Sequence, residues 1–184
     1  MQFPLLNGIR SNLLTASVLA VIAASCGCGR AASAADVTDA PRFAYVANVS
    51  ANTVSEYMIN PATGQLGAKG AVAAGQRPRG IATDPLGRYV YVVNYKESTF
   101  FEYTITNDGV LTPMQNSPIN VGEGPLAVIV DRSGKFVYIL NHSGNTISQF
   151  GISGNGALNA LNPARVRAGS GPSLSEIRVP HFLQ

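Results

Sequence analysis

Apolar and polar residues alternate in short runs along most of the chain, and the runs end at turn residues about every ten positions. Residues 79–83 form one such run, which a turn over residues 84–87 ends, and residues 88–93 and 99–105 form two more. The turn has the sequence DPLG, in which proline presets the backbone and glycine closes the bend. Short runs of strand-forming residues between such turns predict an all-β protein.

The pattern of runs repeats along the chain. Segments 42–48, 88–94 and 135–141 each begin with a basic and an aromatic residue and end with asparagine, and they start 46 and 47 residues apart. A period in the forties with four short strands per unit is typical of the blades of a β-propeller. The second strand of the middle unit is apolar at successive positions, as expected for a blade that its neighbours cover on both faces.

We therefore predict an incomplete β-propeller over residues 42–172, made of about three four-stranded antiparallel units with a repeat of about 47 residues. Two of these units are complete, and the first lacks its first strand. In the middle unit, residues 110–120 hold a weaker fourth strand. Residues 173–184 form an off-pattern tail, because Glu176 stands where the earlier repeats have Ile129 and Ala82.

The N-terminal segment has the layout of a secretory signal. One charged side chain, Arg10, precedes an apolar run over residues 13–24, which is shorter than the roughly 20 residues that span a membrane. The sequence AASC at residues 23–26 resembles a bacterial lipobox, in which the cysteine is lipidated after cleavage. We predict a lipoprotein-type signal peptide over residues 1–25, a lipid anchor at Cys26 and a tether over residues 26–41.

These features predict a protein exported to the bacterial cell envelope or periplasm, in contact with the membrane only through the lipid at Cys26. Two other interpretations stay open at this point. Cleavage after the small residues Ala32-Ser33-Ala34 would release a protein without either cysteine. A buried N-terminal helix is the third interpretation, and the lack of a polar face between Leu13 and Ala24 argues against a surface helix there.

Composition narrows the function classes. With 46% apolar and 12% charged residues, the chain reads as globular. Its net charge of +3 is spread along the sequence without the aromatic-interleaved basic stripe of nucleic-acid-binding proteins, so we expect no nucleic-acid partner. The two cysteines, Cys26 and Cys28, lie at the end of the N-terminal segment, which leaves the body without a disulfide or thiolate site. The sequence has no metal-ligand cluster and predicts no cofactor.

The unit from Gly75 to Asn94 resembles the repeat of the lactonase-type propellers, a family that includes bacterial 6-phosphogluconolactonases and carboxymuconate cyclases. Tyr57, Tyr103 and Phe150 fit the end of the third strand in that repeat. The resemblance implies seven blades around an axial pocket, so this chain of about three blades reads as truncated. It departs from the family where Gly80 replaces a frequent histidine after Arg79.

In an up-and-down blade, the loop that leads into the first strand and the loop between the second and third strands emerge at the same end. We expect these loops to form one binding face, which carries Arg77, Asn94, Lys96, Glu97, Glu123 and Asn141. The expected catalytic residues are two. Arg79 can bind a carboxylate or phosphate through two hydrogen bonds, and His142, the only histidine of the repeat region, can act as a general base near neutral pH.

Structural interpretations of the same residues stay open. Arg79 can pack its stem on the neighbouring blade, and His142 can be a solvated loop residue. Asn48, Asn94 and Asn141 recur at one repeat position, which favours a role in turns over catalysis.

Three functions are consistent with these residues. The first is an exported hydrolase of a sugar or organic-acid lactone, with a small lactone as substrate. The second is a non-catalytic, envelope-attached propeller that binds a protein or glycan. The third is a truncated chain without activity of its own, which would self-associate through its open blade edges.

Overall fold

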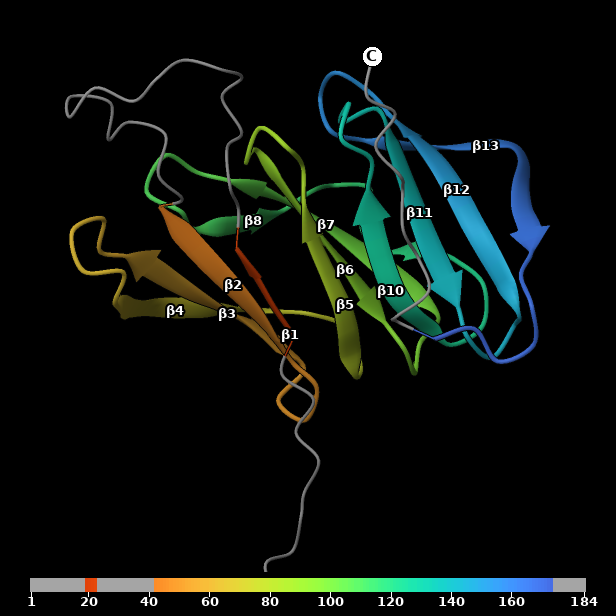
Figure 1. Ribbon diagram of the computed structural model, residues 1–184, viewed down its shortest axis with the longest axis horizontal. Helices are drawn as coiled ribbons and strands as arrows, with labels where there is room; N and C mark the ends of the chain where they lie inside the picture. The colour runs from red at the N-terminus through yellow and green to blue at the C-terminus, as the bar shows by residue number, and fades with distance from the viewer. Residues whose placement is uncertain (1–18, 23–41, 174–184) are drawn as a thin grey trace, which may run out of the picture.

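The computed structural model describes residues 19–22 and 42–173, and its regular elements there are all β-strands in three antiparallel sheets (Figure 1). The first sheet contains β1 (Leu19–Ile22), β2 (Phe43–Asn48), β3 (Thr53–Ile59) and β4 (Leu66–Ala73). The second contains β5 (Pro78–Thr83), β6 (Tyr89–Asn94), β7 (Thr99–Ile105), β8 (Leu111–Pro113) and β9 (Ile119–Asn120). The third contains β10 (Pro125–Val130), β11 (Phe136–Asn141), β12 (Thr146–Ile152) and β13 (Leu158–Arg167). The predicted all-β fold of four-stranded units is confirmed.

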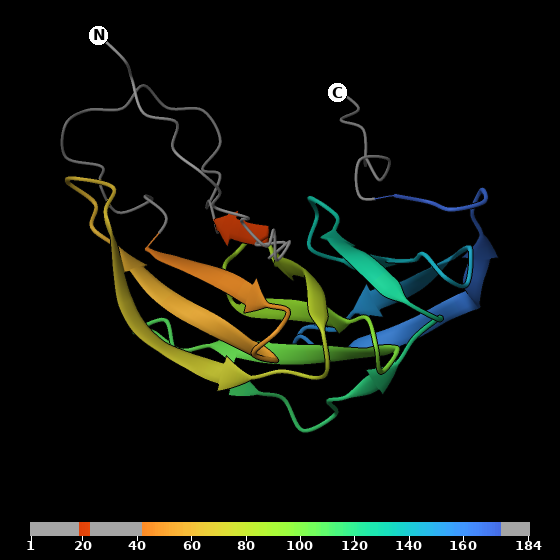
Figure 2. The same cartoon turned by 90° about the horizontal axis from the view of Figure 1, so that it is seen from below.

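Each sheet is a meander in which consecutive strands pair, except that β9 pairs with β7. We call the three sheets the first, second and third blade. Their first strands face the middle of the molecule, so that β5 lies between β1 and β10 (Figure 1). Seen from below, the blades follow one another along an arc (Figure 2). This is the arrangement of neighbouring blades in a propeller.

In the second and third blades, an aspartate builds the turn between the first and second strands. Asp84 Oδ1 accepts hydrogen bonds from the backbone N–H groups of Arg88 and Tyr89, and Asp131 Oδ1 accepts them from Lys135 and Phe136. An aspartate in this place closes the turn with its own side chain, which explains why it recurs in the sequence.

The core lies between the blades. Every residue of β6 is buried, and its side chains alternate between two apolar clusters. Tyr89, Tyr91 and Val93 join the cluster against the third blade, whereas Val90 and Val92 join the cluster against the first blade. Side chains of a strand point to opposite faces in turn, so the continuous apolar run of β6 is confirmed as the mark of a blade covered on both sides.

The fourth strand of the second blade differs from the single weak strand expected over residues 110–120. It is divided into β8 and β9, and both pair with β7. Between them, the Ser117 hydroxyl accepts a hydrogen bond from the Glu102 N–H, 2.7 Å away, and Met114 N–H donates to the Glu102 carbonyl. A side chain therefore replaces one rung of the backbone ladder, which explains the interruption.

The first blade also differs from the expected three strands. Leu19–Ile22, within the segment predicted as a signal peptide, pairs antiparallel with β2 in the position that β5 and β10 hold in the other blades. The remaining parts of the expected signal peptide and tether, Cys26 among them, lie outside the described residues, as does the tail after Ser173. The signal peptide and the lipid anchor stay predictions.

Candidate functional site

The two kinds of loop expected to share one end of the molecule do so. In the second blade, Tyr95 N–H donates to the Arg77 carbonyl at 3.0 Å, and Lys96 N–H donates to the Gln76 carbonyl. In the third blade, His142 N–H donates to the Gly124 carbonyl at 2.9 Å. Backbone hydrogen bonds thus tie the loop before each first strand to the loop after the second strand.

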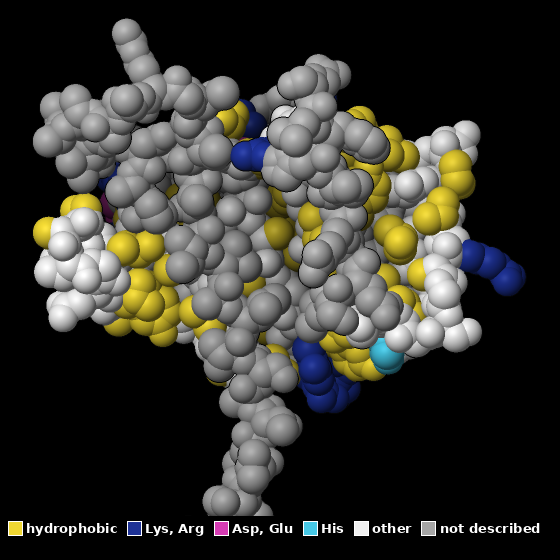
Figure 3. All heavy atoms as spheres, in the orientation of Figure 1, with side chains coloured by type: hydrophobic (Ala, Val, Ile, Leu, Met, Phe, Trp, Pro, Cys, Tyr) yellow, Lys and Arg dark blue, Asp and Glu magenta, His cyan; other side chains and the backbone are white. Residues whose placement is uncertain are grey.

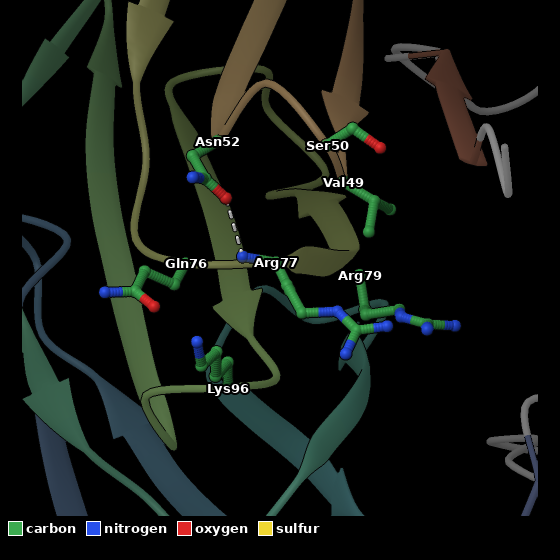
Figure 4. A pocket seen from close by; sticks show the side chains of 7 residues that line it. All are labelled: Val49, Ser50, Asn52, Gln76, Arg77, Arg79 and Lys96. Carbon is green, nitrogen blue, oxygen red and sulfur yellow. Dashed lines mark hydrogen bonds between the residues drawn. The ribbon is translucent and has the colours of Figure 1, made fainter.

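At this end, a cavity of about 470 Å³ opens between the first and second blades (Figure 4). It is lined by Val49, Ser50, Asn52, Gln76, Arg77, Arg79 and Lys96. Three of these side chains are cationic and none is acidic, so the cavity favours an anion. Lys and Arg side chains also gather at this edge of the molecular surface (Figure 3).

The backbone at Arg77 is unusual for its residue type. Arg77 has a φ of 55°, and the residues one and two repeats later, Gly124 and Gly171, have φ values of 58° and 62°. A left-handed backbone costs a side-chain-bearing residue roughly 1–2 kcal/mol more than it costs glycine. The chain therefore keeps an arginine at a position where its own repeats use glycine.

A side chain of the first blade holds this loop in place. Asn52 Oδ1 accepts a hydrogen bond from the Arg77 N–H at 2.9 Å, and Asn145 Oδ1 accepts one from the Gly171 N–H at 2.8 Å. Our sequence-based site did not include Asn52. Its recurrence at the repeat position of Asn145, with a left-handed φ in both, is a signal that could have found it, because asparagine tolerates that conformation well.

Arg79 comes from β5 and shares an aromatic platform with Arg77. Its guanidinium lies 5.4 Å from the centre of the Tyr95 ring, and that of Arg77 lies 5.9 Å from it. The guanidinium groups of both arginines extend toward the same open side of the cavity (Figure 4). The Nε atom of Arg79 is buried without a hydrogen-bond partner, and a ligand oxygen would satisfy such a donor.

His142 lies on the corresponding loop of the third blade, outside the residues that line the cavity. Its Nδ1 is 2.7 Å from the Pro172 carbonyl oxygen, which can only accept, so in the neutral ring Nδ1 carries the proton and Nε2 the lone pair. The neighbouring Ser143 hydroxyl is 3.2 Å from the Tyr95 hydroxyl. Tyr95, which lies on the expected binding-face loop of the second blade, thus connects the arginine pair with the loop of His142.

The other expected binding-face residues lie at this end in two different ways. Lys96, Glu97 and Glu123 are exposed, and of these only Lys96 lines the cavity. Asn94 and Asn141 are fully buried, and their amide groups donate to Thr99 and Thr146 hydroxyls across the hairpin. These two asparagines connect the ends of neighbouring strands, as their recurrence in the repeat suggested.

Gly80, which stands where the resembling family often has histidine, has no room for a side chain. A Cβ atom there would lie 2.9 Å from the Ala127 Cα and 2.9 Å from Val93 Cγ2. The first strands of the second and third blades approach each other closely at this point, so a histidine would force them apart.

Within residues 19–22 and 42–173, no group of three or more His, Cys, Asp or Glu side chains is arranged to hold a metal ion. The same part of the chain contains no helix long and apolar enough to cross a membrane.

Solved structures that share this arrangement of blades are longer chains. A protein from Lactobacillus plantarum superposes with a TM-score of 0.65 at 20% identity, over 71% of this chain and 40% of its own. A functionally unknown protein from Desulfotomaculum acetoxidans gives 0.58 at 26% identity, over 64% and 37%. The periplasmic gluconolactonase of Pseudomonas aeruginosa gives 0.63 at 18% identity, over 72% and 39%.

This chain therefore spans about two fifths of the length of the structures that it matches. No curated protein matches it. The family model described as "Lactonase, 7-bladed beta-propeller" matches residues 10–124 and 96–184. The chain belongs to the family of lactonase-type, seven-bladed β-propellers.

Proposed function

We propose that the cavity between the first and second blades binds the acidic group of a small sugar acid or organic acid, and that the protein is a lactonase-like hydrolase whose substrate carries that group. The observation that carries this proposal is Arg77. The chain retains a guanidinium on a strained, left-handed backbone where its other repeats have glycine. Such strain is kept where the side chain has a task.

Arg77, Arg79 and Lys96 would share the anion in this proposal. A carboxylate or phosphate oxygen can accept from the buried Nε of Arg79, and the fork of an arginine matches both oxygens of a carboxylate. Tyr95 holds both guanidinium groups from one side, which limits their freedom before a ligand arrives. Preorganised charges of this kind bind an anion at a smaller entropic cost.

Hydrolysis would use His142 as the base. Its Nε2 would accept a proton from the water that attacks the lactone carbonyl, the ring C–O bond would break, and the alkoxide would take up a proton to give the hydroxy acid. An exported location, in the envelope or periplasm and with a lipid at Cys26, belongs to the same proposal. The likeness to a periplasmic gluconolactonase supports export, and export favours substrates without phosphate.

A second candidate is a non-catalytic, envelope-attached propeller that binds a glycan or protein through the same loops. The observation that favours it is the lining of the cavity, which contains cations and amides but neither a histidine nor a carboxylate. Binding of an acidic ligand requires no more than this set.

Titration calorimetry with gluconate tests the binding step. Wild type should bind, and the variants Arg77→Gly and Arg79→Leu, which copy Gly124 and Leu126 of the next repeat, should bind at least about tenfold more weakly, a loss of about 1.4 kcal/mol. Lys135→Gln, on the exposed turn before β11, removes the same charge away from the cavity and should bind as wild type does.

Arg77→Gly also separates binding from folding. Relief of about 1–2 kcal/mol of left-handed strain offsets the roughly 0.5–1 kcal/mol that glycine loses in backbone entropy. Its free energy of unfolding should therefore equal or exceed that of wild type while binding is lost. Equal affinity in wild type and both arginine variants would refute the anion site.

Lactone hydrolysis decides between the two candidates. The rate of acid release from glucaro-1,4-lactone, which keeps a free carboxylate beside the lactone ring, should exceed the uncatalysed rate and fall in His142→Gln. Gluconate binding without hydrolysis above the uncatalysed rate would support the binding protein instead.

A further inference from the structure

The same contacts hold both junctions between blades. An aromatic ring at the start of each second strand covers a turn glycine of the following blade: Phe43 covers Gly109, and Tyr89 covers Gly156. The packing is close, because a Cβ on either glycine would lie less than 2.4 Å from at least one ring carbon atom. The glycines have φ values of 82° and 86°, so the backbone also requires glycine here.

Two hydrogen bonds repeat across the same junctions. Tyr45 and Tyr91 donate from their hydroxyls to the carbonyls of Gly109 and Gly156, at 2.9 and 3.3 Å. Burial raises the pKa of both hydroxyls above the ordinary value, which keeps them protonated as donors.

The third strands supply the second repeated bond. Glu56 Oε1 accepts the N–H of Leu111 at 2.8 Å, and Glu102 Oε1 accepts the N–H of Leu158 at 3.1 Å. Each blade thus offers a ring, a hydroxyl and an acceptor on one side, and a turn glycine followed by a leucine N–H on the other.

The third blade repeats the half that consists of a ring, a hydroxyl and an acceptor, and no further described blade covers it. Phe136, Tyr138 and Gln149 occupy the repeat positions of the ring, the hydroxyl and the acceptor. We call these three residues the trailing face. The Phe136 side chain is 37% exposed, although Tyr89 at the same repeat position is 9% exposed.

The first blade carries the complementary half. Gly64, with a φ of 71°, has no atom within 4 Å of the position of a Cβ. Leu66 is 56% exposed, whereas Leu111 at the same repeat position is 4% exposed. We call Gly64 and Leu66 the leading face.

We propose that two copies of this chain associate head to tail, with the trailing face of one copy on the leading face of the other. Phe136 then covers Gly64, the Tyr138 hydroxyl donates to the Gly64 carbonyl, and the Gln149 side-chain oxygen accepts the Leu66 N–H. A glutamine accepts a backbone N–H as a glutamate does, because both have a carbonyl-type oxygen.

The partner is a second copy because one chain carries both the trailing face and the leading face. The residues of these two faces occupy the same repeat positions as the residues that make the two junctions inside the chain. The contact is heterologous, since different surfaces meet, so it either closes into a ring or continues into a filament. It would bury two exposed apolar side chains, Phe136 and Leu66, in the way that the internal junctions bury Tyr89 and Leu111.

Sedimentation velocity of the full chain tests the proposal. Wild type should sediment as a dimer or larger species, and Phe136→Asp and Leu66→Glu should each raise the apparent dissociation constant about a hundredfold. Leu86→Glu introduces the same charge at a side chain that is 69% exposed on a turn of the second blade. This control should associate as wild type does.

A mixture of Leu66→Glu and Phe136→Asp, the two end-face variants, provides the decisive measurement. The trailing face of Leu66→Glu and the leading face of Phe136→Asp are both intact, so an equimolar mixture should form heterodimers although neither variant associates alone. Circular dichroism and thermal unfolding must show that both variants are folded as wild type is.

Three results would overturn head-to-tail association: a wild-type monomer at tens of micromolar, association that neither end-face variant weakens, or a mixture that stays monomeric. If the chains associated through the N-terminal segment, neither variant would weaken association, because both variants keep that segment. That outcome is the second of these three results.

Discussion

Glu102 shows what burial does to a single residue in this fold. The side chain is fully buried, one of its oxygens accepts the Leu158 N–H, and the other has no hydrogen-bond partner among the described residues. Desolvation raises the pKa of the carboxyl from 4.5 to about 6, although the Leu158 hydrogen bond lowers it. A neutral carboxyl fits this place better than a carboxylate, because the charged form loses its hydration.

We therefore expect the stability of the protein to depend on the protonation of Glu102. Because its pKa in the folded chain lies above the unfolded value, the stabilisation is present below about pH 4.5 and is lost as the pH rises through about 6. A shift of this size corresponds to about 2 kcal/mol. Urea unfolding between pH 4 and 7 should show this loss in wild type.

Glu102→Gln provides the comparison, since an amide keeps the acceptor for Leu158 and does not titrate. Its unfolding free energy should lack this part of the pH dependence, whereas Glu97→Gln, at an exposed loop position, should retain it. Identical pH profiles for wild type and Glu102→Gln would show that the carboxyl titrates normally in the fold.

At the scale of elements, the hairpin between the third and fourth strands fixes how far apart two blades lie. The turn glycines of the second and third blades touch aromatic rings of the preceding blade, so the turn is at once a reversal of the chain and a packing surface. A glycine after a strand-forming run is typical of a turn. Their role as a packing surface depends on the aromatic ring of the preceding blade.

A matched pair of glycine substitutions separates the two roles. Gly156→Ala and Gly87→Ala both place a Cβ on a left-handed backbone, at φ 86° and 65°, but only Gly156 faces a ring. Both variants should lose about 1–2 kcal/mol through the backbone, and Gly156→Ala should lose about 1–3 kcal/mol more through overpacking against Tyr89. Chemical denaturation measures the difference. Equal losses in the two variants would mean that the turn and Tyr89 move apart at no measurable cost in unfolding free energy.

At the scale of the whole molecule, buried apolar contacts are concentrated in the second blade. Its strand β6 contributes to both apolar clusters, whereas β2 and β11 each contribute to one. The outer blades bury fewer positions on their second strands, and Phe136 is exposed. Cooperative opening should therefore begin at the outer blades, because they have fewer buried apolar contacts.

Hydrogen exchange followed by mass spectrometry checks this order. Peptides covering β6 should exchange most slowly, with β2 and β11 faster. If β2 or β11 exchanged more slowly than β6, the two-sided burial of the second blade would not set the order of opening.

The sequence by itself determined the blades. The period of 46 and 47 residues, the turn motifs and the continuous apolar run of β6 depend on residues close together in the chain, so the repeat could be read without a structure. It also indicated Arg79 as an anion-binding residue, and it placed Arg77 and Lys96 on the same end. These expectations rest on strand alternation and on reversal at turns.

Only the tertiary structure decided which loops meet. The side chains of Val49, Ser50 and Asn52 line one cavity with Arg77 and Arg79 because two blades pack at a particular spacing, which no local pattern encodes. The strained backbone of Arg77, the division of β8 from β9 and the strand formed by Leu19–Ile22 are likewise products of packing between distant segments. The residues of one repeat determine the strands and turns of one blade. A site between blades depends instead on contacts between residues of different repeats, which form only when the blades pack together.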